Sequence, residues 1–254
     1  MNYTTYYTRG QRVFLINADT GRDQTCFEGF SATIAGCDND LFELRPRYPL
    51  NHGQDRVVSA GMLYKVTAES YGSGVQFLGR LSHVNGGLVR LKPAGPIEMY
   101  QRSQVPRSDL LVSYKLFTRT APLAVFQHEW RRLQQGLTPA TAARIDLQSG
   151  QLNLGMGGLS YRVAQSEPQS DLAMAVIMLQ PDSLPICAVA EQLWRRTMPD
   201  GSGSVIGRRF VQITKHDQKR IEQHLQQLAK QTKKKIKPAK TNWELLDRML
   251  HDQC

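Results

Sequence analysis

Turn-forming residues recur at short intervals through the first hundred residues, and this spacing constrains the fold more than any other feature of the sequence. The segments between them are rich in β-branched, aromatic and aliphatic residues and show no helical period. These predicted strands are Arg12 to Ile16, Leu41 to Arg45, Met62 to Val66, Val75 to Leu78 and Leu88 to Leu91. Short strands at this spacing predict a small closed or split β-barrel.

A second series of predicted strands follows the stretch Ile97 to Pro106. Its first two strands are separated by Leu123 to Gln135, which carries apolar residues at helical spacing and ends at Gly136. The six predicted strands are Leu110 to Phe117, Gln151 to Leu154, Leu159 to Ala164, Leu172 to Leu179, Ile186 to Trp194 and Val205 to Ile213. We therefore expect a second, six-stranded barrel that contains a helical insertion.

Helices are expected at the end of the chain. Thr214 and Asp217 have the spacing of an N-terminal helix cap, and an apolar stripe follows them. After Pro238 a second capping pattern precedes a short apolar cluster. The stripe consists of Ile221, Leu225 and Leu228, and the cluster of Leu245, Leu246, Met249 and Leu250. The apolar face of the last helix needs a partner, either the body of the protein or another subunit, so a homodimer is one possibility.

Together these patterns predict a mainly all-β protein of two small β-barrels in tandem. We expect a split β-barrel over residues 1-98 and a barrel with C-terminal helices over residues 99-254. No apolar run approaches the ~20 residues of a membrane-spanning helix, and the N-terminus lacks the apolar stretch of a secretion signal. The cysteines and histidines show no zinc-ligand spacing and no disulfide framework. We expect a cytoplasmic protein without a metal or a cofactor.

The net charge of +10 is unevenly distributed. Residues 1–98 carry ten Lys/Arg against nine Asp/Glu, whereas residues 99–254 carry twenty-two against thirteen. Because a local positive field concentrates phosphates, an anionic partner is expected to meet the second half of the chain. Part of the excess lies in a lysine-rich segment, 233–240, which is more simply a solvated tail.

Two short stretches have residue types suited to binding an anion. Gln101 to Arg107 is a basic arm before the second barrel, and arginine can donate paired hydrogen bonds to a phosphate or to a guanine edge. Asn153 to Leu159 contains Gly155, Gly157 and Gly158, whose exposed N–H groups can form an anion-binding concavity. Alone, a glycine cluster between strands usually makes a turn, and arginines in a linker are usually solvated. A strand follows the glycines, so they are not a dinucleotide fingerprint.

The order of these features resembles the PilZ domain preceded by the N-terminal barrel of flagellar-brake-type PilZ proteins. That family shows R-R-x-x-x-R in the arm, then [D/N]-x-S-x-x-G, then an "IG..F" strand and a C-terminal helix. The matching stretches here are 101–107, 153–158, Ile206-Gly207-Arg208-Arg209-Phe210 and the helix from Thr214. Upstream, Gly10 to Ile16, Ser31 to Ile34, Leu41 to Pro46 and Val75 to Leu78 resemble the companion barrel.

The resemblance implies a receptor for cyclic di-GMP, bound as a monomer or an intercalated dimer. Its ligand-binding residues would be Arg102, Arg107, Asn153, Gly155, Gly157 and Gly158. Ser103 stands where the family has its middle arginine, and Gly155 stands where it has serine. One charged hydrogen bond contributes roughly 1.5–3 kcal/mol, so the missing arginine is expected to weaken affinity on the order of tenfold to a hundredfold.

Three other functions compete with this interpretation. A degenerate PilZ adaptor would act by protein–protein contact without nucleotide, and Ser103 and Gly155 favour it. A nucleic-acid binder would fit the basic pI, but few aromatic residues interleave with the basic ones. An enzyme is not expected, since no grouping of nucleophile, base and carboxylate is present. For a receptor, we expect a protein partner in motility, secretion or polysaccharide machinery.

Overall fold

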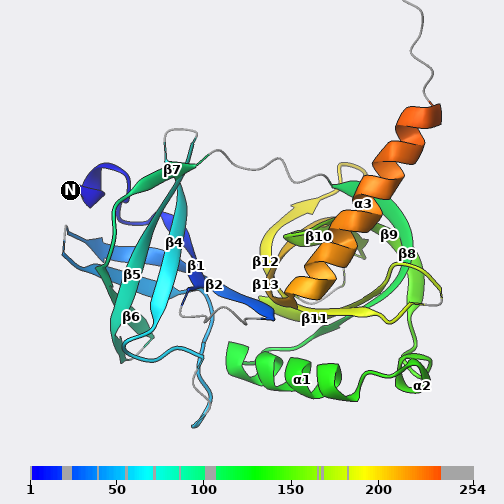
Figure 1. The fold of residues 1–254 in the computed structure, drawn as a ribbon, viewed down its shortest axis with the longest axis horizontal. Helices are drawn as coiled ribbons and strands as arrows, with labels where there is room; N and C mark the ends of the chain where they lie inside the picture. Colours follow the sequence, from blue (N-terminus) through cyan, green and yellow to red (C-terminus); the bar gives the residue numbers. More distant parts are fainter. Residues whose placement is uncertain are drawn as a thin grey trace, which may run out of the picture.

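The computed structural model describes residues 2–18, 25–38, 40–54, 57–70, 73–85, 87–100, 107–164, 166, 169–181 and 183–235. Strands dominate these residues, and they form two barrels that lie side by side (Figure 1). Helices α1 and α3 both accompany the second barrel. The expected fold class, mainly β with two barrels in tandem, is confirmed.

The first barrel is a ring of antiparallel strands in the order β1-β4-β5-β6-β3-β2, closed by pairing of β2 with β1. A 3-10 helix, Tyr3–Thr5, precedes it, and β7 pairs with β5. The strands are β1 (Arg12–Asn17), β2 (Cys26–Cys37), β3 (Phe42–Pro46), β4 (Leu63–Ser70), β5 (Ser73–Asn85), β6 (Leu88–Pro93) and β7 (Glu98–Tyr100). In the core of this barrel the rings of Tyr7, Phe42 and Phe77 pack with centroids 4.9–5.6 Å apart.

The five strands predicted for this half are present, but β2 is longer than the short stretch that resembled a companion-barrel strand. Its glycines hide it from a composition-based prediction, since glycine weakens a strand. Gly29 has a packing reason: an added Cβ atom would lie 2.6 Å from the carbonyl oxygen of Leu15. Glycine therefore lets β1 and β2 approach closely where the ring closes.

The second barrel contains all six strands predicted for it, in the order β13-β10-β9-β8-β11-β12, and closes through β12 and β13. The strands are β8 (Ser108–Thr118), β9 (Gln148–Gly155), β10 (Gly158–Val163), β11 (Leu172–Met178), β12 (Ile186–Thr197) and β13 (Ser204–Thr214). Helices α1 (Leu123–Gly136) and α2 (Pro139–Ala142) form the predicted insertion between β8 and β9. Trp130 of α1 donates a 2.8 Å hydrogen bond from Nε1 to the carbonyl oxygen of Cys187.

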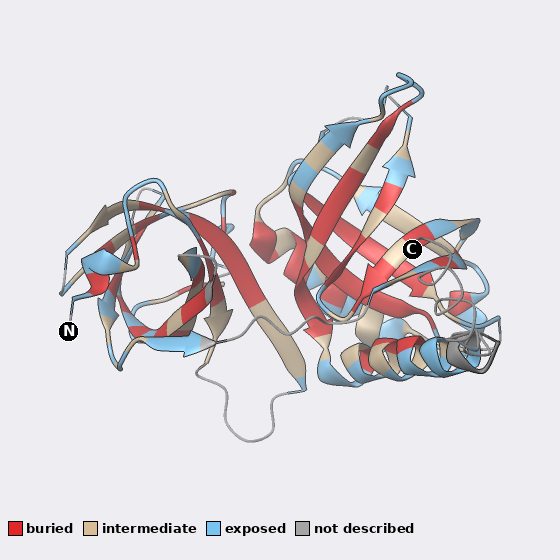
Figure 2. Ribbon diagram, turned by 90° about the horizontal axis from the view of Figure 1, so that it is seen from above, coloured by how far each residue is buried: buried red, intermediate tan, exposed pale blue. Residues whose placement is uncertain are grey.

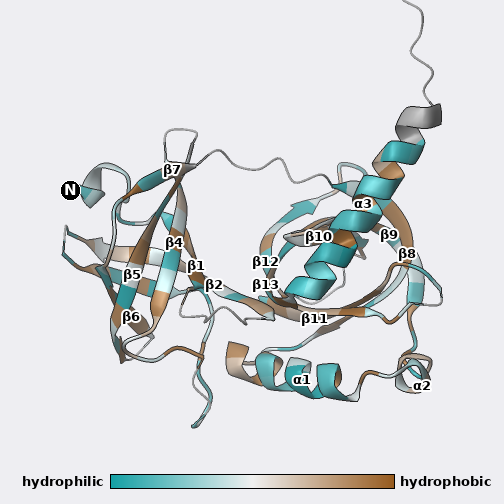
Figure 3. Ribbon diagram, viewed as in Figure 1, coloured by the Kyte–Doolittle hydropathy of each residue, from teal (hydrophilic) through white to brown (hydrophobic). Residues whose placement is uncertain are grey.

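Helix α3 (Lys215–Lys235) follows β13 directly. The backbone N–H of Asp217 donates to Oγ1 of Thr214 over 2.9 Å, which is the predicted cap. Ile221 and Leu225 are buried in the core cluster of the second barrel. Figure 3 shows hydrophilic residues over much of the remaining surface of α3. The second predicted helix, around 241–250, lies outside the described residues.

The barrels are joined by backbone hydrogen bonds and by a shared core. Strand β13 pairs with β2, with Ile213 opposite Phe27. The N–H of Leu123, at the start of α1, donates 2.8 Å to the carbonyl oxygen of Pro49 in the first half of the chain. One cluster of buried residues runs from the first barrel to α1 and the outer face of β11, and Figure 2 shows burial along the strands of both barrels. The boundary at residues 98 and 99 stays a prediction.

Candidate functional site

A large cavity lies at the junction of the two barrels, with a volume of about 1240 Å³. The first barrel contributes β1 and β4 to its wall, and the second contributes the start of β8, the β9–β10 turn and β13. Its lining includes two basic residues of the first barrel, and basic residues and glycines of the second half of the chain. These basic residues, and the glycines at the β9–β10 turn, are Arg12, Lys65, Arg107, Gly155, Gly157, Gly158, Arg208 and Arg209. Four of the six residues predicted to bind ligand therefore line one cavity.

Arg107 and Gly155 are brought together by strand pairing. Ser108 at the start of β8 pairs with Leu154 of β9, which places the residue before one strand beside the end of the other. A Cβ atom at Gly155 would lie 2.9 Å from Cγ of Arg107, so the arginine side chain passes over the glycine. Partial desolvation lowers the pKa of the Arg107 guanidinium from its ordinary value. Arg107, the last residue of the basic arm, and the glycine turn are far apart in the sequence and thus meet at this point.

The glycines of the turn have different structural roles. A Cβ atom at Gly158 would overlap the carbonyl oxygen of Arg208, so only glycine allows β10 this close to β13. A Cβ atom at Gly157 would meet no heavy atom within 4 Å. The carbonyl oxygen of Gly157 accepts a 2.9 Å hydrogen bond from the N–H of Phe210, which fixes the turn on β13. Gly158 is needed for folding, whereas Gly157 leaves open space at the cavity.

The other two predicted residues lie elsewhere. Asn153 is half-buried on β9 and donates a 3.0 Å hydrogen bond from Nδ2 to Oδ1 of Asp109, its cross-strand partner. It is not part of the cavity lining. Arg102 lies outside the described residues. The binding roles assigned to all six residues stay predictions.

Arg209 was not expected at the site, although the "IG..F" strand that contains it was. Its place on β13 is directly opposite Gly158 of β10. The guanidinium lies 4.3 Å from the ring centroid of Phe14 in the first barrel and has Nε 3.7 Å from Oε1 of Glu191. Side chains alternate between the two faces of a strand. Arg208 and Phe210 of β13 are buried inside the second barrel, so Arg209 between them points out of that barrel. This alternation is the sequence signal that was missed.

Arg208 is a buried arginine with incomplete hydrogen bonding. Its Nε donates to the hydroxyl of Tyr161 over 3.0 Å, and its Nη2 donates to the carbonyl oxygen of Ser170 over 3.2 Å. Nη1 is buried without a hydrogen-bond partner among the described residues, and no carboxylate pairs with the side chain there. A buried cation without a counter-ion is costly, so Arg208 adds to the positive field at this end of the barrel.

The cavity lining carries more positive than negative charge. Its basic residues are Arg12, Lys65, Arg107, Arg208 and Arg209, and its acidic residue is Glu69, which gives a formal charge of +4. The positive charges come from both barrels. Because low-dielectric walls focus such a field, this cavity suits a ligand with more than one negative charge.

A buried carboxylate joins the barrels next to the cavity. Glu191 of β12 accepts hydrogen bonds from Ser31 Oγ at 2.6 Å and from the Tyr48 hydroxyl at 2.8 Å. Burial and the charge of Glu191 raise the pKa of Tyr48 well above its ordinary value. Ser31 and Tyr48 belong to the first half of the chain, while Glu191 and its ion-pair partner Arg209 belong to the second. The network therefore couples a cavity residue to the contact between the barrels.

In the part of the chain that the structure describes, no group of three or more His, Cys, Asp and Glu side chains is arranged to hold a metal ion. Among those same residues, no helix has the length and apolar character required to cross a bilayer.

Comparison with known proteins gives structural matches only. No family model matches the chain, and no curated protein matches it. The Bacillus subtilis inhibitor of motility MotI/DgrA matches with a TM-score of 0.35 and 14% identity, over 88% of this chain and 99% of that one. Escherichia coli YcgR in complex with c-di-GMP matches with a TM-score of 0.31 and 12% identity, over 89% and 87%.

A tetrameric PilZ domain from Xanthomonas campestris matches with a TM-score of 0.33 and 16% identity, over 51% of this chain and 89% of that one. The solved structures similar to this chain thus include a PilZ domain and a complex with cyclic di-GMP.

Proposed function

We propose that this chain is a receptor that binds cyclic di-GMP in the cavity between its barrels, and that it is not an enzyme. One observation carries the proposal: Arg107, the glycine turn and Arg209 converge on one basic cavity to which the first barrel adds Arg12 and Lys65. Cyclic di-GMP presents two phosphates and two guanines, and arginine bonds to either group through its planar fork.

The cavity has the size and the chemistry for such a ligand. Its volume of about 1240 Å³ exceeds the ~300–1,000 Å³ of a pocket for an ordinary drug-sized molecule. Gly157 offers unobstructed backbone at the wall, so a phosphate or a guanine edge can approach closely. Arg107 lies over the turn and is available to close on the ligand from the side of the arm.

The proposed signal is a change in how the barrels sit against each other. A ligand that touches Arg209 competes with Glu191 for the same guanidinium, and Glu191 is bonded to Ser31 and Tyr48 of the first half. Weakening that network would loosen one barrel relative to the other and present a new surface. The proposed binding partner of that surface is a cytoplasmic protein of motility, secretion or polysaccharide machinery.

A degenerate adaptor that works without nucleotide is the second candidate. Gly155 stands where the family has serine. A serine Cβ at this position would lie 2.9 Å from Cγ of Arg107, so the Arg107 side chain would have to move. Together with Ser103 in the arm, this arrangement favours a site that has lost part of its ligand contacts.

Calorimetric titration with cyclic di-GMP separates the two candidates. Arg107→Ala is expected to weaken binding by about tenfold to a hundredfold, because it removes a charged hydrogen bond from a partly dry site. Arg144→Ala is the matched control, since Arg144 is exposed and is not part of the cavity lining. Its affinity should equal that of the unchanged chain.

Restoring the family pattern completes the test. Binding only by the double variant Ser103→Arg, Gly155→Ser would identify a degenerate adaptor. Absence of binding by the unchanged chain and by a correctly folded double variant would refute the nucleotide site.

A further inference from the structure

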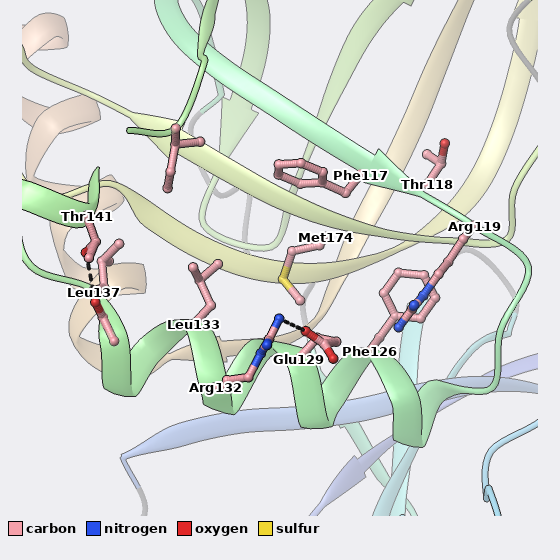
Figure 4. Close-up of a pocket in the computed structure, with 12 residues that line it drawn as sticks. Phe117, Thr118, Arg119, Phe126, Glu129, Arg132, Leu133, Leu137, Thr141 and Met174 are labelled. Atoms are coloured by element: carbon pink, nitrogen blue, oxygen red, sulfur yellow. Dashed lines mark hydrogen bonds and ion pairs between the residues drawn. The ribbon is translucent and has the colours of Figure 1, made fainter. Parts of the chain in front are cut away.

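A second cavity lies between α1 and the outer face of β8 and β11 (Figure 4). Its volume is about 660 Å³, within the ~300–1,000 Å³ range of small-molecule sites. Apolar side chains make most of its wall: Phe117, Phe126, Leu133, Leu137, Ile145 and Met174. This groove shares no lining residue with the cavity between the barrels, so it is a separate site.

The charges at the rim of the groove leave one cation uncompensated. Arg132 pairs with Glu129 of the same helix, with Nη2 2.7 Å from Oε2. Arg119 lies over the ring of Phe126, 5.6 Å from its centroid, and has no ion pair within the described part of the chain. The lining therefore carries Arg119 and Arg132 against Glu129, a formal charge of +1. An apolar groove with one free guanidinium complements a monoanion with an apolar body.

We propose that this groove binds a single-chain amphiphile with a carboxylate head group, such as a medium-length fatty acid. The carboxylate pairs with Arg119, whose fork suits that group. The chain lies along α1 toward Leu137, in the direction seen in Figure 4. Phe126 and Gly136 are ten positions apart on α1, so the helical part of the groove runs about 15 Å at 1.5 Å per residue. A dianionic phosphate ester would leave one charge without a partner, which favours the carboxylate.

The first test is a series of straight-chain carboxylates, from hexanoate to tetradecanoate, titrated into the full chain below their micelle concentrations. Affinity is expected to rise by about fourfold per added methylene until the groove is filled, since each buried methylene contributes about 0.8 kcal/mol. Dodecanol, which has the chain but no charge, should bind at least tenfold more weakly than dodecanoate. Equal binding of the alcohol would overturn the role of Arg119.

Three variants locate the site. Arg119→Gln should weaken dodecanoate binding at least tenfold, whereas Arg131→Gln, an exposed α1 arginine outside the lining, should not. Gly136→Leu should abolish binding by filling the groove, because a Cβ atom there meets no heavy atom within 4 Å. Since leucine favours the helix more than glycine does, the melting temperature of this variant should not fall.

Chain-length-independent binding would overturn the proposal, and so would binding that Gly136→Leu leaves intact while the fold is preserved. Binding to phosphatidylglycerol vesicles without binding to free carboxylates would also overturn it and would assign the groove to a lipid surface. If no carboxylate binds at all, the fatty-acid proposal is rejected. The groove would then be assigned to an apolar segment of a protein partner.

Discussion

The two neighbouring glycines of the turn differ in packing, since Gly158 lies against the backbone of β13 and Gly157 faces open space. The sequence alone could predict Arg107 and the turn, because arginine and repeated glycine are visible as residue types. Strand alternation could indicate that Arg209 points out of the barrel, but not that it faces the same cavity, since that depends on the register of β10 with β13. Nor could the sequence predict Glu191, because a buried carboxylate finds Ser31 and Tyr48 only after the barrels dock.

The two neighbouring glycines make a matched pair of substitutions. Gly158→Ala should lower the free energy of unfolding by about 1–3 kcal/mol, because the new methyl overlaps the backbone of Arg208. Gly157→Ala should change it by no more than about 0.5 kcal/mol, since its Cβ meets nothing within 4 Å. Urea denaturation of both variants measures this difference. Equal stabilities would contradict the close approach of β10 and β13.

At the scale of helices and strands, local patterns predicted most of what the structure shows. The strands of the second barrel, the inserted helix α1 and the capped helix α3 follow from turn residues, apolar period and the Thr214 spacing. Strand β2 is longer than the stretch Ser31 to Ile34 that resembled the companion barrel, and its Gly29 serves packing against β1 rather than turning the chain. Local composition cannot distinguish those two uses of glycine.

The cap of α3 gives a prediction at this scale. Thr214→Ala should lower the free energy of unfolding by about 1 kcal/mol, because the N–H of Asp217 loses its acceptor at the start of the helix. Thr214→Ser keeps the hydroxyl and should remain close to the unchanged chain. Chemical denaturation monitored by circular dichroism compares the two variants. A serine variant as unstable as the alanine variant would show that the methyl group, and not the hydrogen bond, matters.

At the scale of the whole molecule, the junction of the barrels determines what the cavity can bind. Strands β2 and β13 pair there although Gln212 and Glu28 are 184 positions apart in the sequence. No local pattern encodes a contact over that separation, so the tandem arrangement could be predicted but its docking could not. The docking places Arg12 and Lys65 opposite Arg107 and the glycine turn, and the basic cavity exists only because of it.

The most direct test of this account is a calorimetric titration of cyclic di-GMP into the full chain and into Lys65→Ala. Lys65 belongs to the first barrel, whereas the residues that the family resemblance assigns to ligand binding lie in the arm and the second barrel. We expect saturable binding of cyclic di-GMP by the unchanged chain. Lys65→Ala should weaken this binding by roughly threefold to tenfold, because one phosphate contact is lost, and its affinity should depend less steeply on salt concentration. Undiminished affinity in Lys65→Ala, or no binding by the unchanged chain, would contradict a nucleotide site shared between the barrels.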